Sequence, residues 1–240
     1  MSHIFPGRRT QQRRSKKRPR ADLESDEEAE TPRMRTVKTV GNHIYFNGVV
    51  DDRSVSELIH VIEHKNFELR MIASHELVDK ITPSPLYLHI NSDGGMVFSA
   101  MSAFDAIKRS KLPIYTIVDG RAFSAGSVIA MAGTRRFMTK HSYLMIHQLS
   151  SGVIGTYSNI KDEYENSSQM MEDIVNIYHK NTRISIKKKA LRKLMMRDKY
   201  WRIDECIRYG LVDADWDDHD HNSTEVTMDN VIDLITRKKD

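Results

Sequence analysis

The sequence predicts an α/β domain built around a largely parallel sheet. Short apolar or alternating segments, typical of strands, are separated by longer segments with helical periodicity. Strands that alternate with helices favour parallel pairing, because each helix returns the chain to the same end of the sheet. A length of 240 residues, with 39% hydrophobic and 29% charged residues, also suits one large globular domain.

Each predicted element has its own local signal. Residues 43–50 alternate and predict a strand, and Ser54 with Glu57 has the spacing of a capping box at the start of a helix. Pro85 and the glycine turns bound the later strands, and amphipathic or small-residue runs predict the helices between them. The further elements expected are strands at 86–90, 113–118, 136–139 and 143–146, and helices at 97–109, 124–131, 158–180 and 187–196.

The two ends of the chain differ in composition from its middle. Residues 1–20 carry eight Arg or Lys and no acid, whereas residues 21–31 carry six acids and no base. Residues 1–38 are so charged and so poor in large apolar side chains that we expect a disordered tail. Residues 39–216 form the expected domain, and residues 217–240 are interpreted as a C-terminal extension.

Charge outside the tail is nearly balanced. The net charge of +4 falls to about +2 without residues 1–31, so the domain itself is not expected to bind nucleic acid. The basic run at 13–20 resembles a nuclear-import or nucleic-acid patch in composition, and the alternative, a solubilising tail, is preferred. No apolar run approaches the roughly 20 residues of a membrane span, and the N-terminus lacks the apolar core of a secretory signal. With Cys206 as the single cysteine, these features favour a cytoplasmic protein.

Three polar residues stand where apolar segments end. Ser124 follows a strand and a glycine turn, His147 ends an apolar strand, and Asp198 lies in a charged loop. A hydroxyl, an imidazole and a carboxylate together can make serine a nucleophile near neutral pH. Each residue alone has a simpler interpretation, as a helix cap, as one of eleven histidines, or as part of a solvated charge cluster.

A glycine pair adds possible backbone donors to this set. Gly94 and Gly95 follow a strand, and glycine lets a backbone N–H approach a ligand closely. Together with the N–H of Ala125 they would form an oxyanion hole, and the alternative is an ordinary tight turn. The phosphate-binding pattern Gly-x-x-x-x-Gly-Lys-Ser/Thr does not occur, so we do not expect an ATPase. The run 217–221 is interpreted as a solvated linker rather than a metal site, and Cys206 as a packed residue rather than a nucleophile.

Taken together, four segments resemble the proteolytic subunit of the Clp protease, a self-compartmentalising serine peptidase. The similarity covers about residues 44–215. Its segments are Ile44–Gly48, Leu86–Gly95, Met145–Gln148 and Arg197–Asp213. The resemblance implies a crotonase-like spiral of repeated β-β-α units, with the helix at 158–180 as a protruding handle.

The same resemblance implies roles for the residues of the site. Ser124 would be the nucleophile, His147 the general base and Asp198 the residue that orients the base. The backbone N–H groups of Gly95 and Ala125 would form the oxyanion hole. Neither a metal nor another cofactor is implied.

The resemblance also implies an assembly and a substrate class. Subunits would form two stacked heptameric rings, a tetradecamer, that enclose the active sites and receive unfolded polypeptides from a separate AAA+ unfoldase. A strand at Ser150–Thr156 would pair with an extended substrate. Asp93 stands where the family usually has proline, and residues 67–82 are an insertion. The alternatives are another enzyme of this fold, such as a signal-peptide-peptidase-like protein with a Ser–Lys dyad or an acyl-CoA hydratase, and a non-catalytic ring subunit.

Overall fold

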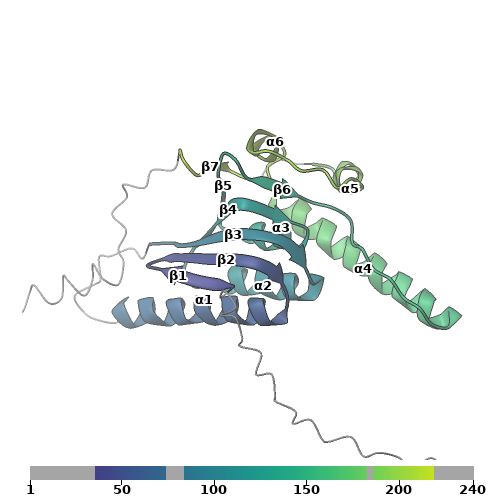
Figure 1. The fold of residues 1–240 in the computed structure, drawn as a ribbon, viewed down its shortest axis with the longest axis horizontal. Helices are drawn as coiled ribbons and strands as arrows, with labels where there is room; N and C mark the ends of the chain where they lie inside the picture. Colours follow the sequence, from purple (N-terminus) through teal and green to yellow (C-terminus); the bar gives the residue numbers. More distant parts are fainter. Residues whose placement is uncertain (1–35, 74–83, 183–185, 219–240) are drawn as a thin grey trace, which may run out of the picture. The chain divides into compact units, whose positions relative to one another are not determined.

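A mixed sheet organises the protein, and most of its strands are parallel. The computed structural model describes residues 36–73, 84–182 and 186–218. The strands are β1 (Val37–Val40), β2 (His43–Val50), β3 (Leu86–Gly95), β4 (Ile114–Phe123), β5 (Arg135–Met138), β6 (Tyr143–Met145) and β7 (Ala214–Asp215). Their order is β1-β2-β3-β4-β5-β7, and β6 pairs with β4 off this path (Figure 1). The β1–β2 pair is antiparallel and the other pairs are parallel, which confirms the predicted α/β class.

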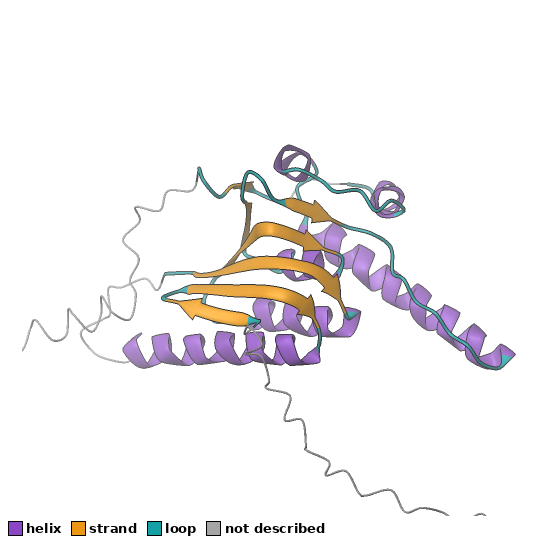
Figure 2. Ribbon diagram, viewed as in Figure 1, coloured by secondary structure: helices purple, strands orange, loops and turns teal. Residues whose placement is uncertain are grey.

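Helices connect the parallel strands. They are α1 (Asp52–Ala73), α2 (Val97–Arg109), α3 (Ala125–Ala130), α4 (Tyr157–Asn181), α5 (Lys188–Met195) and α6 (Ile203–Arg208). Helix α2 contacts both α1 and α3, and the three helices cover one face of the sheet (Figure 2). Of the helices that the structure describes, none has the length and apolar character needed to cross a membrane.

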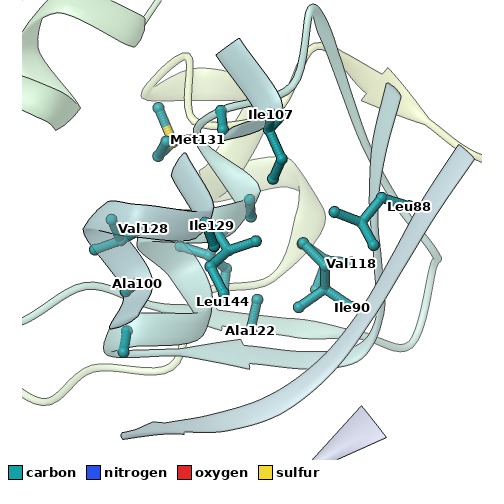
Figure 3. Close-up of a cluster of buried hydrophobic side chains, with 14 of the residues drawn as sticks. Leu88, Ile90, Ala100, Ile107, Val118, Ala122, Val128, Ile129, Met131 and Leu144 are labelled. Atoms are coloured by element: carbon teal, nitrogen blue, oxygen red, sulfur yellow. The ribbon is translucent and has the colours of Figure 1, made fainter. Parts of the chain in front are cut away.

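The main hydrophobic core lies between the sheet and these helices. Alternate residues of β3, such as Leu86, Leu88 and Ile90, are fully buried and belong to it. Side chains of the strands and of the helices meet across this core (Figure 3): Leu88, Ile90 and Val118 from strands, and Ala100, Ile107 and Ile129 from helices. Close packing here holds the ends of β3 and β4 against α3, where the site is located.

Along β3, β4 and β5, the residues that alternate with those of the main core form a smaller hydrophobic cluster on the opposite face of the sheet. Tyr87, Ile117 and Phe137 are buried there and pack against Tyr115 and Trp216. This second cluster explains why β3 is buried on both faces, as parallel strands commonly are.

The structure differs from the predicted elements at several boundaries. Helix α1 begins at Asp52, because Asp51 caps it: Ser54 N donates to Asp51 Oδ1 at 2.7 Å and Asp51 N donates to Ser54 Oγ at 3.0 Å. The predicted capping box, with Ser54 as the cap, is therefore wrong by three residues. Strand β3 continues through the predicted turn to Gly95, and β4 continues to Phe123. Residues 150–156, expected as a strand, have no regular secondary structure.

The structure describes only part of the predicted N-terminal tail, insertion and C-terminal extension. Strand β1 includes Val37 and Lys38, which the sequence assigned to the charged tail; the rest of that tail before residue 36 lies outside the described residues. Helix α1 contains the first part of the predicted insertion, and residues 74–82 are outside the description. Of the predicted C-terminal extension, Asp217 and Asp218 are described.

Helix α4 leaves the sheet and extends away from it (Figure 1). Its buried residues are Ile174, Val175 and Tyr178, all near its C-terminal end. The N-terminal half of α4 is largely exposed to solvent. Only the base of this long helix therefore belongs to the core, as expected for a protruding helix.

Candidate active site

Ser124 occupies the sharp turn between β4 and α3. Its backbone has φ 52° and ψ −121°, and it is the one non-glycine residue with positive φ among the residues described. A left-handed backbone at a residue with a Cβ is strained, and such strain concentrates at functional sites. Ser124 N donates to Met145 O at 3.0 Å, which ties the turn to β6. The turn has the form of a nucleophile elbow.

His147 lies two residues beyond β6, beside Ser124. Strand β6 pairs with the end of β4, and Phe123 is opposite Met145 in the register. This pairing brings His147 Nε2 to 2.7 Å from Ser124 Oγ. The distance is that of a hydrogen bond through which the imidazole can accept the hydroxyl proton.

Asp198 completes the set from the loop after α5. Backbone hydrogen bonds of 3.0 and 2.8 Å join Leu144 of β6 to Trp201, and Tyr200 stacks on Phe123 with centroids 4.6 Å apart. These contacts hold the loop so that Asp198 Oδ1 lies 3.2 Å from His147 Nδ1. The Asp198 side chain is 76% exposed, whereas that of His147 is 24% exposed. The structure thus brings together three residues that are far apart in the sequence.

The two glycines at the end of β3 lie next to the Ser124 turn, and Gly94 packs directly against Ser124. Gly94 has φ +102°, and a Cβ on it would lie 2.7 Å from Ser124 Cβ. Gly95 has φ +149°, and a Cβ there would lie 2.2 Å from Val50 O. Gly95, Ser124, Ala125 and His147 line one cavity of about 120 Å³. Glycine is needed at both positions because the backbone approaches its neighbours too closely for a side chain.

A salt bridge beside these glycines has no counterpart in the sequence prediction. Arg121 Nη2 donates to Asp93 Oδ2 at 2.8 Å, and Arg121 Nε also pairs with Asp93 Oδ1. The two-pronged contact joins the segment before the glycines to the strand before Ser124. Asp93 precedes Gly94 and Arg121 lies three residues before Ser124, but no local pattern links positions 28 apart in the chain.

Ser127 and Tyr178 are further neighbours of Ser124 that sequence reasoning missed. Tyr178 and Ser127 are joined by a 2.7 Å hydrogen bond, and Ser127 Oγ donates to the Ser124 carbonyl at 2.6 Å. Tyr178 comes from the base of α4, and the periodicity of this helix predicts its burial but not its partner. Both residues are buried.

The other sequence candidates take no part in this site. Cys206 is buried in α6, and burial, with a smaller contribution from Glu205, raises the pKa of its thiol to about 12. A thiol with so high a pKa is a poor nucleophile at neutral pH. No group of three or more His, Cys, Asp or Glu side chains placed to hold a metal occurs in the described part of the chain. The histidines of the 217–221 run lie outside it.

Comparison with known proteins places the chain in a family. The family model for Clp protease matches residues 50–216. The chain is 33% identical over 146 residues to the ATP-dependent Clp protease proteolytic subunit of Deinococcus radiodurans, covering 60% of this chain and 71% of the relative. It is 33% identical over 174 residues to the ATP-dependent Clp protease proteolytic subunit 1 of Protochlamydia amoebophila, covering 71% of this chain and 78% of the relative. The chain therefore belongs to the Clp protease family and is a serine-type endopeptidase.

Proposed function

We propose that Ser124, His147 and Asp198 are the catalytic triad of this peptidase. The observation that carries the proposal is the hydrogen-bonded series from Ser124 Oγ through both nitrogens of His147 to Asp198, with distances of 2.7 and 3.2 Å. A strained backbone at Ser124 supports it, because the elbow presents the hydroxyl at the surface of the cavity.

The proposed mechanism is acyl transfer through Ser124. His147 Nε2 accepts the hydroxyl proton as Ser124 Oγ attacks the scissile carbonyl, and then gives that proton to the leaving amine. Water, activated by the same imidazole, releases the acyl group. Asp198 accepts a hydrogen bond from His147 Nδ1–H, which holds the tautomer that leaves Nε2 free to accept a proton.

The developing negative charge would be stabilised by backbone donors. Ala125 is the first residue of α3, so its N–H has no partner within the helix, and it lines the cavity together with Gly95. Two such donors aimed at the carbonyl oxygen form an oxyanion hole, and one of them is typically worth roughly 10²–10³ in kcat.

The substrates we propose are unfolded polypeptides in extended conformation. Residues 150–156 are exposed and have no regular structure, so their backbone is accessible for strand pairing with a peptide. A groove of about 730 Å³ runs between this segment and α4, and Gly152, Glu163 and Arg192 are among its lining residues. The groove and the smaller cavity at Ser124 share Gln148 and Leu149.

We also propose that the chain works as a homo-oligomer, in two stacked heptameric rings fed by a separate AAA+ unfoldase. Large apolar side chains are exposed on α4 and just before it: Ile154 is 102%, Ile160 49% and Tyr164 73% exposed. Such a surface is typical of an interface between subunits. The name of the Deinococcus radiodurans relative describes an ATP-dependent protease, which supports an energy-dependent partner.

The alternative functions predict different chemistry. A signal-peptide-peptidase-like enzyme would use a lysine as base, whereas Ser124 Oγ here is hydrogen-bonded to the imidazole of His147. A non-catalytic ring subunit would not need the contact between Ser124 and His147. Intact geometry at both contacts therefore favours the triad.

Active-site labelling tests the proposal. A fluorophosphonate should label the wild-type oligomer at Ser124, and casein should be degraded in parallel. Ser124→Ala should lose labelling, with kcat lower by on the order of 10⁶. The matched control is Ser158→Ala, an exposed serine near the start of α4, which should label normally. Labelling that persists in Ser124→Ala, or that occurs on another residue, would reject the assignment.

A further inference from the structure

A buried chain of hydrogen bonds joins helix α4 to the main chain of the nucleophile. Ser127 Oγ donates its proton to the Ser124 carbonyl at 2.6 Å. Because a serine hydroxyl has a single proton, Tyr178 must be the donor in the 2.7 Å bond between Tyr178 Oη and Ser127 Oγ. Ser127 is 0% and Tyr178 1% exposed, so water does not compete for either bond.

The Ser124 carbonyl, which accepts the last of these hydrogen bonds, belongs to the same peptide unit as the Ala125 N–H. The Ser124 C=O and the Ala125 N–H are the two ends of one planar peptide, and they point in opposite directions. Any contact that fixes the direction of the carbonyl therefore also fixes the direction of the N–H. That N–H is one of the two donors proposed for the oxyanion hole.

This peptide unit needs external support. The strained φ of 52° at Ser124 persists only where surrounding contacts determine it. The Ser124 carbonyl also accepts from Ser127 N at 2.9 Å and Val128 N at 3.3 Å, which are helix-start contacts. The hydroxyl of Ser127 adds the shortest contact to this carbonyl.

We propose that Ser127 and Tyr178 are positioning residues that hold the Ser124–Ala125 peptide so that Ala125 N–H faces the oxyanion. The proposal rests on the function proposed for Ser124 and goes beyond it, because it assigns a role to two residues outside the triad. Tyr178 also lines the cavity beside Ser124, so the same side chain bounds the space next to the reacting carbonyl.

The hydrogen bond from Tyr178 to Ser127 should not depend on pH near neutrality, because the phenol remains protonated there. Burial raises the pKa of Tyr178 above its usual value of 10.0, an effect only partly offset by the hydrogen bond with Ser127. The phenol therefore stays protonated and keeps donating at neutral and moderately alkaline pH. The positioning contact should not appear as a separate ionisation in the pH–rate profile.

Three variants separate positioning from simple stability. Ser127→Ala removes the donor to the carbonyl and leaves the Tyr178 hydroxyl buried without a partner. Tyr178→Phe removes the outer donor alone. The double variant removes both polar groups, so no buried hydroxyl is left unpaired, and its thermal stability should recover relative to Ser127→Ala.

The proposal predicts that the reaction rate does not recover with stability. In Ser127→Ala and in the double variant, kcat for a fluorogenic peptide and the rate of fluorophosphonate labelling should each fall roughly five- to tenfold, as expected for one lost hydrogen bond. KM should be nearly unchanged, whereas a peptide boronate, whose tetrahedral adduct places an oxygen in the oxyanion hole, should bind weaker by the same factor. Tyr157→Phe, at an exposed tyrosine of the same helix, is the matched control and should behave as the wild type.

The outcomes distinguish this proposal from the one on which it rests. Wild-type protein that is not labelled at Ser124 would overturn the triad and, with it, the positioning role. Labelling of wild type at Ser124, together with a double variant that regains both stability and rate, would leave the triad intact and overturn the positioning role. A fall in rate accompanied by an equal rise in KM, with unchanged boronate affinity, would also overturn it.

Discussion

Asp198→Asn tests how much the charge of an exposed carboxylate contributes to the proposed triad. Asparagine keeps the shape and an acceptor oxygen near His147 Nδ1, so the substitution mainly removes charge. The two atoms are 3.2 Å apart, and the Asp198 side chain is 76% exposed. With the dielectric constant of water, a unit charge at this distance stabilises the imidazolium by about 1 kcal/mol.

This magnitude sets the expected result. We predict that kcat of Asp198→Asn falls roughly tenfold at neutral pH, far less than for a buried carboxylate, because solvent screens the charge. Steady-state hydrolysis of a fluorogenic peptide measures the change, and raising the salt concentration should reduce the difference from wild type. Asp162→Asn, at an exposed aspartate of α4, is the matched control.

Two results would refute the reasoning. An unchanged kcat would mean that Asp198 does not act on His147. A loss comparable to that of Ser124→Ala would mean that Asp198 is shielded from water in the working enzyme, so that the exposure seen in the single chain does not set its electrostatic contribution. Repeating the assay on dissociated and assembled protein would identify which state shields it.

Three further substitutions have defined outcomes. Gly94→Ala should lower kcat/KM by on the order of 10² or more, since its Cβ would lie 2.7 Å from Ser124 Cβ; peptide hydrolysis by folded protein checks this. Arg136→Met should destabilise the fold by about 3–5 kcal/mol in a denaturant titration, because it removes the guanidinium that lies 2.9 Å from the buried Asp213 carboxylate and balances its charge, and a change below about 1 kcal/mol would contradict this. For Cys206, the folded thiol has a pKa raised from 9.0 to about 12, so it retains its proton where the unfolded thiol loses it and stability declines as pH rises from 9. Cys206→Ala should remove up to about 1.4 kcal/mol per pH unit of that decline, and an unchanged slope in pH-dependent unfolding would show the burial argument to be wrong.

Much of the fold follows from local sequence, because its elements are periodic. Strand β2 has the predicted bounds, and α4 differs from the prediction by one residue at each end. Strand β7 has two residues and carries too little periodic signal to be predicted. The start of α1 was misplaced because Asp51 and Ser54 can both cap a helix, and only the observed hydrogen bonds decide between them.

The candidate site was predictable where a residue lies at the end of an element. Ser124, His147 and Asp198 each follow such an end, and the structure brings them within hydrogen-bonding distance. The Ser127–Tyr178 and Arg121–Asp93 contacts join residues 51 and 28 positions apart. Contacts of this kind depend on how strands and helices pack in three dimensions, and no short pattern in the chain contains that information.

The pairing of β6 with β4 has a consequence for engineering. Residues Lys140 and His141 form an exposed turn between β5 and β6, but β6 takes its position from the far end of β4 and from the Ser124–Met145 backbone contact. These contacts, rather than the turn itself, set the distance between Ser124 Oγ and His147 Nε2. A reporter peptide or an affinity tag inserted between Lys140 and His141 should be accepted without loss of turnover.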